Sequence, residues 1–291
     1  MFAIIGIFLV IGALLAGYLM EHGPLMVLFQ PAEFVIIFGA AIGTILIANP
    51  FPVVLRLLKD MLAVFKADAR NKSFYLENLK MLNELFGHAR KNGLPALETD
   101  VDEPAKSALF SKYPNFLKNH HAVHFICDTL RMFITGGIDP FELDQMMELD
   151  MEVHHAEANA PVNALSTTAD ALPGLGIVAA VLGIVITMGA LGGPPEEIGR
   201  KVAAALVGTF LGILLCYGFF SPIAARMSRI NESEAQYYHV VRVGVLAFIR
   251  GSAPILAVEF ARRAIPSSVR PTFSELEATC RRGAATEAVA A

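Results

Sequence analysis

Four long stretches without a charged side chain interrupt an otherwise polar sequence. They are Met1–Met20, Phe34–Leu55, Ala171–Pro195 and Val202–Ala225. Each reaches the roughly 20 residues that a helix needs to cross a hydrocarbon core of about 30 Å. Only residues 21–33 separate the first two stretches and only residues 196–201 the last two, whereas a long polar segment lies between the pairs. The pattern predicts four membrane-spanning helices arranged as two hairpins.

The basic residues indicate on which side of the membrane the polar segments lie. Arg56, Lys59, Arg226 and Arg229 lie just beyond the ends of apolar stretches, within two segments that are rich in Lys and Arg. Basic residues close to span ends accumulate on the cytoplasmic side. We therefore predict an all-α membrane protein with four transmembrane helices, a large helical cytoplasmic domain and both termini in the cytoplasm. Its expected parts are a transmembrane hairpin (1–55), a cytoplasmic helical domain (56–170), a second transmembrane hairpin (171–225) and a cytoplasmic helical tail with a disordered end (226–291).

The polar segments also carry helix signals. Apolar residues in 74–87 and in 123–134 recur at spacings of three and four, which is typical of amphipathic helices. The first pattern breaks at Asn92-Gly93, with Pro95 beyond it. Asp139-Pro140 fits an N-cap followed by proline at the first helical position, and so predicts a new acidic helix. After the fourth apolar stretch, 227–250 and 259–265 are again amphipathic, whereas 283–291 is expected to be disordered.

Composition favours a membrane protein and gives no sign of enzymatic chemistry. Hydrophobic residues make up 55% of the chain and the mean hydropathy is +0.54, above what soluble domains show. The net charge of −4 argues against a nucleic-acid binder. The sequence has no Walker A motif and no nucleophile elbow, so we predict that it is not an enzyme.

Histidine and cysteine residues do not form a recognisable metal or redox motif. His120-His121-Ala122-Val123-His124 lacks the glutamate of a metalloprotease helix, and we interpret it, like His154-His155, as solvated surface. The three cysteines, an odd number in cytoplasmic or membrane positions, are interpreted as inert thiols. We expect no metal and no cofactor.

Few polar groups accompany the apolar stretches, and they are candidates for an ion path because polar groups in a membrane usually face a bundle interior or water. Thr209 and Tyr217 lie eight residues apart on the fourth stretch and are expected to project at similar angles. Thr168 and Asp170 lie at the inner entrance of the third stretch, and Glu33 at the outer start of the second. No stretch carries a carboxylate at its middle, so we expect the acid of an ion relay on a partner chain.

Prolines and glycines add two features to these stretches. Pro173 and Pro222 lie near the inner ends of the third and fourth, where a proline frees a backbone carbonyl and can kink a helix. They are either matched hinges or tolerated packing kinks. Gly39–Gly43 and Gly208–Gly212 are G-x-x-x-G patterns, which let helix backbones approach closely. Such close packing occurs within one subunit or between subunits.

Longer runs of the sequence resemble the MotA family of flagellar stator subunits. These runs are residues 17–20, 30–37, 172–181, 207–214, 217–222 and 257–260, with Ser111-Lys112-Tyr113-Pro114 in the cytoplasmic segment. The similarity in length and layout extends over nearly the whole chain, and it points to the long, proton-type class of the family.

The resemblance implies partners and functional residues. A homo-oligomer of five such chains is expected to surround a dimer of MotB, a single-span, peptidoglycan-anchored protein whose aspartate carries the proton, in the lipid of the bacterial inner membrane. Proton flow would turn the ring and push the rotor protein FliG, driving motility. The implied roles are ion pathway (Thr209, Tyr217, Ala180 and Asp170), conformational coupling (Pro173 and Pro222) and rotor interaction (Arg90 and Glu98). Sodium-type relatives tend to place a hydroxyl residue at the position of Ala180, which favours protons here.

The position of the two rotor residues also has a physical interpretation. Arg90 and Glu98 flank the break at Gly93 and Pro95, so we expect both at an exposed helix tip or turn. Opposite charges in such a place can meet opposite charges on a partner and steer the encounter.

Two other functions are compatible with the pattern. One is an energising subunit like ExbB or TolQ, which serves outer-membrane transport or integrity, although those proteins usually have three spans. The other is a passive scaffold or a small-solute transporter, for which more polar groups are expected at mid-membrane.

Overall fold

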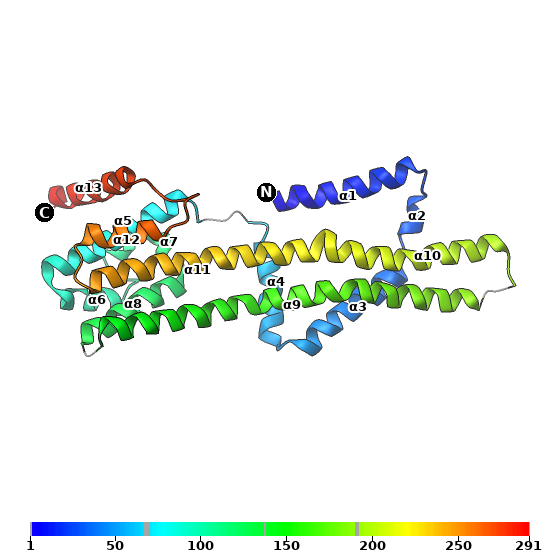
Figure 1. The fold of residues 1–291 in the computed structure, drawn as a ribbon, viewed down its shortest axis with the longest axis horizontal. Helices are drawn as coiled ribbons and strands as arrows, with labels where there is room; N and C mark the ends of the chain where they lie inside the picture. The colour runs from blue at the N-terminus through cyan, green and yellow to red at the C-terminus, as the bar shows by residue number, and fades with distance from the viewer. Residues whose placement is uncertain (1, 67–69, 137, 190–191, 291) are drawn as a thin grey trace. The chain divides into compact units, whose positions relative to one another are not determined.

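A computed structural model of the chain describes residues 2–66, 70–136, 138–189 and 192–290, and it contains no strand in these ranges. Figure 1 shows the order of the helices. Their bounds are α1 Phe2–Met20, α2 Leu25–Leu28, α3 Pro31–Ala48, α4 Phe51–Ala63, α5 Lys72–Asn92, α6 Glu98–Asp102, α7 Pro114–Leu117, α8 His120–Thr135, α9 Pro140–Met188, α10 Pro195–Leu214, α11 Ser221–Ile249, α12 Pro254–Ala264 and α13 Phe273–Ala290, with short 3-10 turns at Leu94–Leu97 and Phe110–Lys112 and a π-helical turn, η3, at Leu215–Phe220.

The helices form two compact units. The span unit consists of Met1–Ala67 and Glu157–Asn231, and the head unit of Asp68–Ala156 and Glu232–Ala291. Helices α9 and α11 contribute residues to both units.

Four helical segments of the described chain are long and apolar enough to cross a membrane. They are Ala3–Met20, Leu25–Ala48, and the long helices Pro140–Met188 and Pro195–Ile249, each of which is apolar over part of its length. The predicted all-α membrane fold with four spans is thereby confirmed. The second apolar stretch, however, is not one helix, because α3 ends at Ala48 and α4 begins at Phe51. Pro50 disfavours helical backbone at Asn49, which is extended (φ −129°, ψ 144°).

The helices that contain the third and fourth spans are longer than the apolar stretches in the sequence. Helix α9 runs from Pro140 to Met188, so the predicted acidic helix and the third span are one element. Likewise α10, η3 and α11 follow one another without a break from Pro195 to Ile249. Residues 196–201, expected as a loop, instead form the first turns of α10.

The span unit is held by two small apolar clusters. One joins Ile37 and Ala41 of α3 to Leu172 of α9 and Leu211 of α10. The other joins Leu57 of α4 to residues of α9 and α11. The Arg226 side chain adds a polar contact, since its Nε donates to the carbonyl of Val64 at 2.9 Å.

The head unit has a single large core of aromatic and aliphatic side chains. Phe86 of α5 is fully buried and stacks on Phe248 of α11, with ring centroids 4.4 Å apart. The predicted helices over 74–87 and 123–134 are confirmed as parts of α5 and α8. The predicted cap at Asp139 is confirmed too, because its Oδ1 accepts from the backbone N–H of Phe141 at 2.6 Å.

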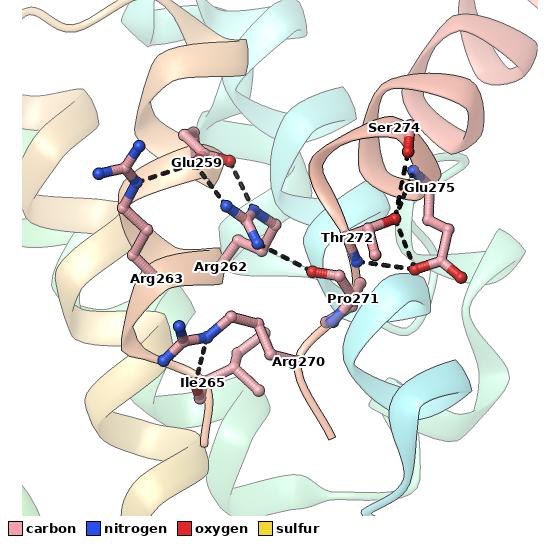
Figure 2. A network of polar contacts seen from close by, with 9 residues as sticks. All are labelled: Glu259, Arg262, Arg263, Ile265, Arg270, Pro271, Thr272, Ser274 and Glu275. Carbon is pink, nitrogen blue, oxygen red and sulfur yellow. Dashed lines mark hydrogen bonds and ion pairs between the residues drawn. The ribbon is translucent and has the colours of Figure 1, made fainter. Parts of the chain in front are cut away.

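The C-terminal helices of the head unit are connected by the polar network in Figure 2. Glu259 accepts hydrogen bonds from Arg262 at 2.7 Å and from Arg263 at 2.9 Å. Thr272 and Glu275 form a reciprocal capping box at the start of α13, and Lys72 pairs with Glu275 at 2.7 Å. Since Lys72, which Figure 2 does not draw, is the first residue of α5, its ion pair with Glu275 attaches α13 to α5. The expected disordered end, 283–291, overlaps α13, which continues to Ala290; Ala291 lies outside the described residues.

Two histidines interpreted as surface from the sequence are packed instead. The rings of His121 and His154 are tilted by 40° with centroids 3.7 Å apart, and both contact Tyr238. The sequence could not show this, because the contact joins helices α8, α9 and α11. His124 agrees with the prediction, since its side chain is exposed beside Asp128.

Candidate functional site

Helices α9 and α10 of the span unit meet through glycines. A methyl group at Gly176 would lie 2.7 Å from the Gly208 carbonyl oxygen and 3.1 Å from the Gly212 Cα. A methyl group at Gly212 would lie 2.5 Å from the Leu172 carbonyl oxygen. The two backbones therefore touch directly, and we call the contact of Gly176, Gly183, Gly208 and Gly212 with the facing helix the glycine seam. Of the two alternatives for the Gly208–Gly212 pattern, this geometry favours packing between helices of one chain over packing between subunits.

The other G-x-x-x-G pattern is different. A methyl group at Gly39 or at Gly43 would meet no atom within 4 Å. This pair on α3 makes no close helix contact among the described residues, so packing between subunits stays a hypothesis for it.

Two of the four predicted ion-path residues lie beside the glycine seam. Ala180 is buried. It follows Ala179, whose methyl carbon would lie 3.2 Å from a methyl group added at Gly208. Thr209 follows Gly208 and is half-buried. The other two lie apart from the seam, since the Asp170 side chain is exposed and Tyr217 is 70% exposed in the turn η3. This π-helical turn begins between Thr209 and Tyr217, so a purely α-helical spacing does not fix their relative direction.

The two predicted coupling prolines occupy different helical environments. Pro173 lies inside α9, directly after Leu172, whose carbonyl contacts Gly212. Its missing N–H leaves the carbonyl of buried Ala169 without the usual helical donor. Pro222 follows η3, in which the Ser221 N–H donates to the carbonyl of Cys216, five residues earlier. Such wide turns frequently mark functional sites in long helices. Pro161, which the sequence interpretation overlooked, is a second proline inside α9.

The predicted rotor residues lie at one end of α5 in the head unit. Arg90 is exposed in the last turn of α5, and Glu98 is the exposed first residue of α6. The chain turns between them at Gly93, whose φ of 85° is a conformation that glycine adopts readily. Neither side chain forms an ion pair with another described residue, so both charges are available at this tip.

The tip is supported by a residue that the sequence did not single out. Arg131 of α8 donates to Asp102 at 2.7 Å and to the Val101 carbonyl at 2.9 Å, and thereby holds α6 in place. The separation of these residues along the chain hid the contact. A lone arginine on an amphipathic helix gives no sign of its partner.

The burial of Glu33 is a further feature that the sequence interpretation missed. Glu33 lies in the first turn of α3 and was expected at the rim of the span, but its side chain is only 6% exposed and lies against Gly208. The sequence did contain a signal that this residue is unusual, since Glu33 is the only charged residue between His22 and Arg56.

The cysteine thiols of the head unit are chemically quiet. Burial raises the pKa of Cys127 to about 12 and that of Cys280 to about 11. A thiol that stays protonated is a poor nucleophile and a poor metal ligand. In the described part of the chain, no three His, Cys, Asp or Glu side chains come together as a metal site.

Comparisons with known proteins match the chain over most of its length. Residues 4–93 match the family described as Motility protein A N-terminal, and residues 117–239 match the MotA/TolQ/ExbB proton channel family. Motility protein A of Escherichia coli K12 is 40% identical over 277 residues, covering 95% of this chain and 94% of that protein. Chemotaxis protein LafT of Vibrio parahaemolyticus is 36% identical over 273 residues, covering 94% of this chain and 96% of that protein.

Two solved structures share the fold. The structure of C. jejuni MotAB superimposes with a TM-score of 0.75 at 18% identity and covers 93% of this chain and 98% of the other. The flagellar MotAB stator complex from Bacillus subtilis gives a TM-score of 0.72 at 24% identity and covers 91% of this chain and 96% of the other.

Proposed function

The chain belongs to the motility protein A family, within the MotA/TolQ/ExbB proton channels, and on this premise we propose that it is a stator subunit of the bacterial flagellar motor. The observation that carries the proposal is the 40% identity to motility protein A of Escherichia coli over 95% of this chain. The chain works with a MotB-like partner, and ion flow past the pair generates torque on the rotor. The bacterial inner membrane, with both termini in the cytoplasm, is its proposed location.

The proposed ion path follows the partner-facing side of α9 and α10. Ala180, Thr209, Tyr217 and Asp170 contribute to it, with Ala180 and Thr209 next to the glycine seam. The acid that binds the transported proton at mid-membrane belongs to the partner. A ring of five chains around two partner chains fits this division of roles.

The two long helices give a physical route from ion path to rotor. Helix α9 contributes Pro140–Ala156 to the head unit and Glu157–Met188 to the span unit, so the two units share one continuous helix. We assign Pro173 and Pro222 as the points at which these helices bend when protonation changes. A proline lacks the N–H that holds the preceding turn, so bending there costs fewer hydrogen bonds.

Arg90 and Glu98 are the proposed contact with the rotor protein FliG. Their charges are exposed and lie on either side of the turn at Gly93. Exposed charges mainly steer encounters and select partners. This role suits a contact that must form and release repeatedly during rotation.

The test is swimming in a strain that lacks this gene and carries the intact gene on a plasmid. We expect the deletion to assemble filaments that do not rotate, and the plasmid to restore rotation. A proton uncoupler should stop the restored strain, whereas removal of the sodium gradient should not. Normal swimming of a deletion strain that has no other stator genes would contradict the proposal.

The same experiment separates the alternative of an ExbB- or TolQ-like energising subunit. That function predicts normal rotation in the deletion strain together with defects in outer-membrane transport or integrity. The four membrane-spanning helices and the motility proteins among the most similar relatives make it the less favoured function.

A further inference from the structure

One carboxylate lies inside the apolar part of the span unit. Glu33 of α3 is 6% exposed, and its Oε2 has no hydrogen-bond partner among the residues that the structure describes. Burying an ionised carboxylate without a partner is costly, and in membrane spans such groups usually have a function. The position of Glu33 therefore needs an explanation beyond packing.

The surroundings of the carboxyl group are built from the smallest residues. A methyl group at Gly208 would collide with Glu33 Oε2 and lie 3.1 Å from Glu33 Cδ. A methyl group at Gly183 would lie 3.6 Å from Glu33 Oε1 and 2.8 Å from the Ala205 methyl carbon. Helices α9 and α10 therefore leave a space that the carboxyl group fills.

This space lies within the apolar section of α10. Gly208 follows Val202, where the uncharged stretch begins, by six residues, which corresponds to about 9 Å along the helix. The carboxyl group of Glu33 therefore lies beside the uncharged stretch of α10, although Glu33 itself is in the first turn of α3. The sequence places Glu33 at the outer start of the second span, and the structure adds that its carboxyl group is buried against α10.

No second charge accompanies the group. Helix α3 has no other ionisable residue, and α2, which packs on α10, has none. On α10 the nearest charged residues in sequence, Arg200 and Lys201, precede the uncharged stretch, and on α9 the nearest is Asp170, thirteen residues before Gly183. Among the described residues, Glu33 belongs to no group of three His, Cys, Asp or Glu side chains that could hold a metal ion.

From this geometry we infer that Glu33 is a proton-binding site of the span unit, which holds a proton as a neutral carboxylic acid in the cradle of Gly183 and Gly208. The site is separate from the acid supplied by the partner. Its use in ion passage rests on the proposed stator function, but the binding itself does not.

The test is chemical labelling of the full-length chain with its partner in native membranes. Dicyclohexylcarbodiimide reacts with protonated carboxyl groups in apolar surroundings. The acid oxygen adds to the carbodiimide carbon and the proton moves to one nitrogen, which gives an O-acylisourea. The acyl group then moves from that oxygen to the other nitrogen, and a stable N-acylurea remains. We expect mass spectrometry to find the label on Glu33, and labelling to fall about tenfold per pH unit above its midpoint. Glu33→Gln should abolish it, and exposed Asp170 should remain unlabelled.

A second measurement guards against poor access of the reagent. Infrared difference spectra between low and high pH should contain a carbonyl band of a protonated carboxyl group that disappears in Glu33→Gln. Exposed Glu196→Gln, in the first turn of α10, is the control that should keep the band. Absence of both label and band would overturn the inference.

Other outcomes also decide the matter. Protection of Glu33 by sodium at constant pH would indicate a cation site and contradict proton binding. Because label and band are read without motility, they can succeed or fail independently of the swimming experiment. If Glu33→Gln also slows swimming while the chain remains in the membrane, proton binding at Glu33 contributes to the motor.

Discussion

In the head unit, large side chains such as Phe86 and Tyr237 fill the space between helices, whereas in the span unit α9 and α10 meet backbone to backbone through glycines. The difference follows from the solvent around each unit. In water, burial of large apolar side chains is the main driving force for packing. Between apolar helices in lipid this force is absent, so close contact of small residues replaces it. Substitutions should therefore fail in opposite ways, by lost volume in the head unit and by added volume in the span unit.

The largest effect on stability is expected from removing a core side chain of the head unit. Phe86→Ala deletes a fully buried ring that stacks on Phe248 and should cost about 3–5 kcal/mol. Circular dichroism during thermal unfolding of the detergent-purified chain measures the loss. Phe141→Ala removes a ring that is 64% exposed and serves as the control. Equal destabilisation by both variants would show that Phe86 is not part of a packed core.

The span unit should respond to the opposite change. Gly212→Ala adds a single methyl group 2.5 Å from the Leu172 carbonyl oxygen and 2.9 Å from the Gly176 Cα. Because both obstacles are backbone atoms, we expect a cost of about 3 kcal/mol, the upper end of the usual overpacking range, together with loss of swimming. Gly174→Ala, where a methyl group meets no atom within 4 Å, is the matched control. A Gly212→Ala strain that swims normally would contradict the glycine seam.

Much of the fold was predictable because its signals are local. The amphipathic periods of α5 and α8 and the cap at Asp139 depend on residues that are close in sequence. The continuity of α9 was not predictable, since the amphipathic pattern changes into an apolar one and Pro161 and Pro173, which ordinarily signal a helix end, lie inside the helix. The burial of Glu33 depends on a helix that starts more than 150 residues later, which no local pattern reveals.

A polar contact of the head unit should give a smaller, pH-dependent effect. The hydrogen bonds from Arg262 and Arg263 lower the pKa of Glu259 from 4.5 to about 2, against a smaller opposing effect of burial. A lowered pKa in the folded state means that this stabilisation is complete above pH 4.5 and is lost as the pH falls toward 2. These hydrogen bonds, shown in Figure 2, join residues of α12, so the stability that they contribute is that of this helix.

Glu259→Gln tests this contribution. The amide keeps one acceptor but loses the charge, so we expect a loss of about 1.5 kcal/mol at neutral pH. The difference from the parent chain should shrink as the pH is lowered through the same window, and thermal unfolding at several pH values measures it. A difference that stays constant down to the lowest pH would mean that the charge of Glu259 does not stabilise the fold.

The smallest effect on stability should come from the residue for which we expect a strong effect on motility. Glu98 is exposed and has no ion-pair partner among the described residues, so Glu98→Lys should change stability by no more than about 0.5 kcal/mol. If Glu98 contacts the rotor, the reversed charge should nevertheless slow swimming while the chain stays in the membrane at normal amounts. Glu152→Lys, which reverses an exposed charge of α9 in the same unit, controls for net charge. Slowing by Glu98→Lys alone would identify the tip as the contact, because a general change of charge would slow both strains equally. The head unit would then combine a core that is sensitive to loss of volume with a surface whose charges matter only to a partner.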